Sequence, residues 1–99
     1  MNFEDFWKKI QSTSDEIELV TLKRKKPFSF CYNHSRNTVD IIPSTKDPRS
    51  SRKQDLKEIW DVAKTVTKPY SPSNYHDITF NSSYIVSIMK YIINDDKLE

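Results

Sequence analysis

Apolar residues recur at helical spacing in three segments of the chain, and we expect each segment to form a helix. In each segment, four of them fall at positions i, i+3, i+4 and i+7, which places them on one face of an α-helix. Asn81 or Ser82 is expected to cap the last helix. The three stripes are Phe3, Phe6, Trp7 and Ile10; Leu56, Ile59, Trp60 and Ala63; and Ile85, Ile88, Met89 and Ile92.

Polar residues predict where the first two helices begin and end. Asn2 can cap the first helix, and Ser12–Ser14 should end it. Ser51 and Gln54 have the spacing of a capping box, in which the serine caps the helix and the glutamine reaches back. This second helix is expected to run to about Val66, because a Lys-Pro step follows soon after.

The segment between these helices changes to the two-residue period of β-strands. Phe28, Phe30 and Tyr32 alternate with small or polar residues and give one strand an aromatic face. Residues 17–22 and 38–42 are β-rich and flank it. Because the connections are short, the three strands should form an antiparallel meander.

These elements predict an α+β fold with the order α-β-β-β-α-α. Three strands are marginal alone, so two to three helices should cover one face of the sheet. We expect the aromatic face of the middle strand to meet Trp60 and Ile85. Ile78 and Phe80 either add a short fourth strand or dock on the core.

Composition excludes several classes of protein. The 99 residues include no glycine, which rules out the glycine-rich loops that cradle phosphates in nucleotide-binding proteins. The single cysteine, Cys31, excludes an internal disulfide and a Cys-rich zinc site, and it favours a reducing cytoplasm. No apolar run approaches the roughly 20 residues that a membrane-spanning helix needs. We expect residues 1–97 to form one domain and the Leu-Glu pair at 98–99 to be a cloning scar.

The net charge of +2 conceals an uneven distribution along the chain. Residues 23–53 carry nine basic and two acidic residues, a net +7, whereas residues 1–22 carry −3 and residues 54–99 carry −2. In a meander, the turn after the first strand and the loop after the third strand leave the same end of the sheet. Eight of the nine basic residues would then share one edge. These candidate phosphate-binding residues are Lys23, Arg24, Lys25, Lys26, Lys46, Arg49, Arg52 and Lys53.

Three of these cations stand at the predicted start of the second helix. There Arg49, Arg52 and Lys53 oppose the helix dipole, at a cost of roughly 0.3–1 kcal/mol each. The arrangement favours an anion docked at that helix terminus, and a nucleic-acid phosphate is the obvious one. The leading interpretation is a small non-catalytic nucleic-acid-binding or regulatory protein, of the kind that phages and mobile elements often encode. The alternative for these side chains is plain solvation.

A second interpretation is a protein-interaction module, such as an immunity-like, antitoxin-like or inhibitor protein. Its surface would combine the last helix with a tyrosine-rich loop. The last helix is apolar over a wider arc than one buried face needs, which also favours a homodimer. Tyrosines more often cover the edge of a core while their hydroxyls reach water. The candidate interaction residues are Tyr70, Tyr75, Tyr84 and Tyr91.

No pattern in the sequence indicates an enzyme, a cofactor or a metal site. His34 and His76 lack the spacing of a metal-dependent nuclease motif. Cys31 and His34 are three residues apart across a strand end, so their side chains should point to opposite faces. Asp40 precedes Lys46, but no second acid is positioned beside them. We therefore expect a non-catalytic protein that needs neither cofactor nor metal.

Overall fold

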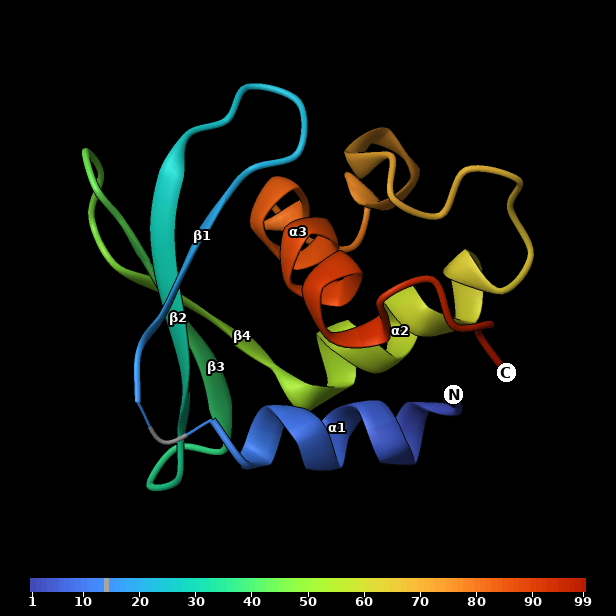
Figure 1. The fold of residues 1–99 in the computed structure, drawn as a ribbon, viewed down its shortest axis with the longest axis horizontal. Coiled ribbons are helices and arrows are strands. Elements are labelled where there is room, and N and C mark those ends of the chain that lie inside the picture. Colours follow the sequence, from blue (N-terminus) through green and yellow to red (C-terminus); the bar gives the residue numbers. More distant parts are fainter. Residues whose placement is uncertain (14) are drawn as a thin grey trace.

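The computed structural model describes residues 1–13 and 15–99 and shows one helix, a four-stranded sheet and then further helices (Figure 1). The α+β class and the antiparallel meander predicted from the sequence are confirmed. The elements are α1 (Phe3–Gln11), β1 (Ile17–Val20), β2 (Pro27–Asn33), β3 (Thr38–Pro43), β4 (Arg49–Arg52), α2 (Lys53–Ala63), the 3-10 helix η1 (Pro72–Tyr75) and α3 (Ser82–Ile93).

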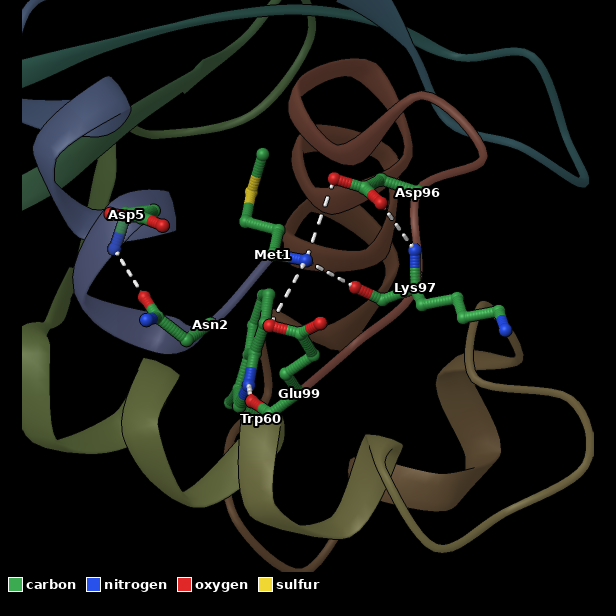
Figure 2. Close-up of polar contacts among 7 residues, drawn as sticks. All are labelled: Met1, Asn2, Asp5, Trp60, Asp96, Lys97 and Glu99. Carbon is green, nitrogen blue, oxygen red and sulfur yellow. Dashed lines mark hydrogen bonds and ion pairs between the residues drawn. The ribbon is translucent and has the colours of Figure 1, made fainter.

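Helix α1 begins where its sequence predicts. The Asn2 Oδ1 accepts a hydrogen bond of 2.9 Å from the amide of Asp5, which satisfies one of the free amides at the helix start (Figure 2). The helix ends at Gln11 with Ser12 as its C-cap. Ser14, the last residue of the predicted helix end, lies outside the described residues. The apolar stripe of α1 is buried, with no member more than 5% exposed.

Segments from the first and last residues of the chain meet beside α2 (Figure 2). The Trp60 Nε1–H donates to the Glu99 carbonyl over 2.9 Å, and the Met1 amino group donates to the Lys97 carbonyl over 2.6 Å. These segments help to cover Trp60, which is fully buried. The expectation that residues 98–99 are a cloning scar concerns their origin and stays a prediction.

The sheet has the strand order β1-β2-β3-β4, and the helices lie on one of its faces (Figure 1). Phe30 in β2 pairs with Ile17 of β1 and Ile41 of β3, so these three share the covered face. The opposite face is more polar and carries Cys31 and Asp40. The residues of β2 and β3 that form the sheet side of the core are Phe28, Phe30, Tyr32, Val39 and Ile41.

The fourth strand lies at Arg49–Arg52, where the sequence predicted a loop and a helix start. Ser51 pairs with Val39 of β3 and points to the core, so the predicted capping box is wrong. Its buried hydroxyl accepts a hydrogen bond of 2.9 Å from the Asn81 Nδ2, which compensates for the burial. Helix α2 therefore begins at Lys53 without a side-chain cap.

Two further boundaries differ from the predictions. Helix α2 ends at Ala63 rather than near Val66. The Thr65 amide donates a hydrogen bond to the Val62 carbonyl, three residues back rather than four. Thr65 and Val66 are β-branched, and such residues favour a helix less. Within the described chain, neither Ile78 nor Phe80 joins the sheet. Ile78 docks on the core, whereas Phe80 is 97% exposed.

The aromatic face of β2 meets aromatic side chains from α1 and α3. Trp60, a predicted partner, instead packs against Phe6 of α1 with 5.0 Å between ring centroids. Ile85 is fully buried in the same core. The aromatic pairs of β2 are Phe28 with Tyr84 (5.1 Å between centroids), Phe30 with Tyr91 (6.4 Å) and Tyr32 with Trp7 (5.8 Å).

Helix α3 is buried on most of its surface, which explains its wide apolar arc. It contacts α1, β1 and η1, and the Ser87 hydroxyl donates to the Val20 carbonyl of β1 over 2.7 Å. The exposed residues of α3 are Ser83, Lys90 and Tyr91. Because the chain's own elements cover the arc, it no longer supports the predicted homodimer.

Candidate nucleic-acid interface

A groove of about 440 Å³ lies between the β1–β2 turn, the β3–β4 connection, η1 and the first turn of α3. These segments occupy the upper part of Figure 1. Five basic residues line the groove, and among the described residues that line it there is no aspartate or glutamate. We call it the basic groove. Its cations are Lys23, Arg24, Lys26, Lys46 and Arg49, and its other lining residues include His76, Phe80, Ser83 and Tyr84.

The β1–β2 turn supplies three of the five cations and is fixed by its own hydrogen bonds. The Lys26 amide donates to the Thr21 Oγ1 over 3.0 Å, and the Lys25 amide donates to the Thr21 carbonyl over 3.0 Å. Lys25 has a φ of 55°, a conformation that glycine would adopt more readily. The turn therefore holds Lys23 and Arg24 exposed beside the groove.

Arg49 is the half-buried cation of the basic groove. It pairs with Ile41 of β3 and therefore points to the helix-covered side of the sheet. Its Cζ lies 5.4 Å from the centroid of the Tyr84 ring, which is a cation–π contact. Its Nε is buried and has no hydrogen-bond partner among the described residues. The ring orients the guanidinium, and its terminal N–H groups, which donate to none of the described residues, can donate to an anion.

The first turn of α3 adds a second feature that suits an anion. Asn81 is the N-cap, as predicted, but its side chain does not cap the helix. Its Nδ2 instead donates to the Ser51 Oγ over 2.9 Å and to the Ser50 carbonyl over 3.2 Å. The first turn of α3 also has no acidic residue. Among the described residues, no side chain accepts a hydrogen bond from the amides of this first turn, and Ser83 of the same turn lines the groove.

The cations of the basic groove are not paired with acids. In residues 1–13 and 15–99, no carboxylate oxygen lies within 4.0 Å of any of them. Elsewhere on the surface, lysines do have such partners: Lys57 lies 2.9 Å from Asp61, and Lys90 lies 2.9 Å from Asp95. The groove thus gathers five cations that form no ion pair within the described residues.

The structure divides the predicted basic edge. Strand β4 runs back along β3, so Arg52 pairs with Thr38 at the opposite end of the sheet from the β1–β2 turn. There Arg52 lies 3.2 Å from the Asp55 carboxylate, and the Lys53 Nζ lies 5.8 Å from the centroid of the Trp7 ring. The predicted anion site at the start of α2 therefore has an acid in its first turn, and the open helix start is that of α3.

Phe80 is a groove residue that the sequence did not single out. Its two-residue spacing from Ile78 predicts a strand or a side chain docked on the core. In the structure, the Phe80 side chain is instead 97% exposed. The Asn81 amide donates to the Thr79 Oγ1 over 3.0 Å and fixes the backbone on one side of it. The alternation with Ile78 indicated a buried side chain, and no pattern in the sequence marks an aromatic residue that is exposed in a groove.

The four candidate tyrosines do not share one exposed surface. Tyr75 is fully buried, its hydroxyl donates to the Pro69 carbonyl, and burial raises its pKa. Tyr84 is also buried and lies under Arg49. Tyr70 is half-buried beside Lys90, and only Tyr91 is substantially exposed, at 51%.

The cysteine and the two histidines lie in three different settings. Burial, together with the charges of Asp40 and Glu16, raises the pKa of the Cys31 thiol, which disfavours a thiolate nucleophile. His34 packs against Tyr32 at the β2–β3 turn, whereas His76 lines the basic groove. No group of three His, Cys, Asp or Glu residues within the described ranges could hold a metal ion. None of the helices among these residues is long and apolar enough to cross a membrane.

Comparisons with protein-family models, with curated proteins and with solved structures find no match for this chain.

Proposed function

We propose that this chain is a non-catalytic nucleic-acid-binding protein that holds phosphates of its ligand in the basic groove. One observation carries the proposal. Five cations from the β1–β2 turn, the β3–β4 connection and the start of β4 line a single groove, and no described residue that lines it is an aspartate or a glutamate. Such a density of unpaired positive charge suits a polyanion, because each neutralised phosphate releases condensed counterions.

The cations have two different roles in this proposal. Lys23, Arg24, Lys26 and Lys46 are exposed and contact phosphates along the groove. Arg49 is oriented by the Tyr84 ring and donates to a phosphate deeper in the groove. Phosphate contacts set the position of the ligand without reading its bases, so binding through them depends little on sequence.

A salt titration of binding tests the proposal. Fluorescence anisotropy would follow a labelled oligonucleotide with increasing protein, between roughly 50 and 200 mM salt. Each phosphate contact contributes a slope of about −0.7 on single strands or about −0.9 on duplex DNA, so five contacts give about −3.5 to −4.5. We expect the affinity to fall roughly a hundredfold or more over this range. Binding that ignores salt, or no binding at the lower salt, would overturn the proposal.

A further inference from the structure

Phe80 stands out as an aromatic side chain that the fold does not use. It is 97% exposed, compared with 51% for Tyr91, the next most exposed aromatic residue among the large hydrophobic side chains of the described chain. An exposed phenylalanine contributes nothing to core burial. Phe80 is one of the residues that line the basic groove, and the others include five cations.

The backbone on both sides of Phe80 is fixed. The amides of Ile78 and Thr79 donate to the Tyr75 carbonyl over 2.9 and 3.1 Å. After Phe80, the side chain of Asn81 is tied to Ser51 of β4 over 2.9 Å. The ring is therefore presented from a constrained turn, which lowers the entropy that a ligand must remove on binding.

The pairing of an exposed ring with unpaired cations selects one class of polyanion. From the basic groove and this ring, we infer that the ligand is a single-stranded nucleic acid, one base of which stacks on Phe80 while neighbouring phosphates contact the cations. The inference rests on the proposed function. Duplex bases are stacked on one another and offer no free face, whereas the bases of a single strand do.

The tyrosine of the groove does not provide another stacking surface. Tyr84 is only 7% exposed, and the guanidinium of Arg49 already lies over its ring. Of the phenylalanine and tyrosine rings in the described groove, only that of Phe80 is thus exposed enough for a base to stack on it. Stacking on a phenyl ring does not read the sugar, so single-stranded DNA and single-stranded RNA share the chemistry that Phe80 recognises.

Replacement of Phe80 provides the test, and its exposure means that the fold should tolerate the change. Phe80→Leu keeps an apolar side chain but removes the aromatic face. Its affinity for a single-stranded oligonucleotide should fall at least about fivefold, while its affinity for the duplex of the same sequence should not change. The wild type should bind the single strand more tightly than the duplex. Parallel titrations with oligo-dT and oligo-U distinguish single-stranded DNA from single-stranded RNA. A loss of affinity for either oligonucleotide in Phe80→Leu supports the inference.

Phe80→Trp gives a direct signal for stacking. Trp7 and Trp60 are buried, so an exposed tryptophan at position 80 would report on the groove. Its emission should be quenched when the single strand binds, with affinity retained. Tyr91→Trp is the matched control, because Tyr91 is exposed on α3 and is not among the groove residues, and its emission should not change.

The outcomes separate this inference from the proposed function. If Phe80→Leu binds as tightly as the wild type, or if the duplex is preferred, stacking on Phe80 is wrong. If Lys23→Ala with Arg24→Ala still weakens binding in that case, the basic groove remains the phosphate site. If neither strand form binds to the wild type, both the function and the stacking inference fail.

Discussion

The guanidinium of Arg49 lies over the ring of Tyr84, with its Cζ 5.4 Å from the ring centroid. This contact joins β4 to the first turn of α3, which are far apart in the sequence. It also places a half-buried cation beside a helix start that has neither a side-chain cap nor an acid in its first turn. The contact therefore places one of the five cations of the basic groove beside the start of α3.

Arg49→Ala should affect both binding and stability. Loss of the cation–π contact should lower the free energy of unfolding by about 0.5–1 kcal/mol, and loss of one phosphate contact should make the salt slope shallower by about 0.7. Arg49→Lys keeps the charge but not the planar guanidinium, so it should recover most of the slope. Urea denaturation and the salt titration measure the two effects. An unchanged slope in Arg49→Ala would exclude Arg49 from the phosphate site.

Asn81→Ala should destabilise the fold through β4. The substitution removes two hydrogen bonds, to the Ser51 Oγ and the Ser50 carbonyl, and leaves a buried hydroxyl with one partner fewer. We expect a loss of about 1–3 kcal/mol in the free energy of unfolding, measured by urea denaturation. A double-mutant cycle with Ser51→Ala should show coupling of about 0.5 kcal/mol or more, and additive effects would contradict the link.

The Cys31 thiol should react slowly with thiol reagents at neutral pH. Its pKa is raised by burial and by the negative charges of Asp40 and Glu16, so the reactive thiolate appears only at a higher pH than for a free thiol. Asp40→Asn removes one of those charges and should lower the pKa and speed alkylation. The rate of alkylation as a function of pH measures both effects. A thiol that reacts at neutral pH like a low-pKa cysteine would contradict this environment.

The elements with strong periodicity were predictable from the sequence. The stripe that begins at Phe3 and the alternation from Phe28 to Tyr32 each fit one period, and both elements formed as expected. These two elements form because one face of each is buried, and the period of apolar residues in a sequence indicates which face will be buried. The class of fold followed from these elements and the short connections between them.

The fourth strand and the true extent of the groove could not be predicted in this way. The strand at Arg49–Arg52 has no apolar residue, and it forms because β3 offers a free edge and Asn81 bonds Ser51. Because this strand runs antiparallel to β3, Arg52 lies at the end of the sheet opposite the groove. Phe80 was expected, with Ile78, to join a strand or dock on the core, because an apolar pattern indicates burial and cannot identify an aromatic side chain that stays exposed.

Removal of two groove cations tests the basic groove most directly. The variant Lys23→Ala with Arg24→Ala is compared with Lys8→Ala with Arg36→Ala, which removes the same charges from exposed positions outside the groove. Anisotropy with one labelled single-stranded oligonucleotide at roughly 50 mM salt gives both affinities. The groove variant should bind roughly tenfold or more weakly than the wild type, and the control should stay close to the wild type. Equal losses in the two variants would show that binding follows net charge, and would contradict a phosphate site in the groove.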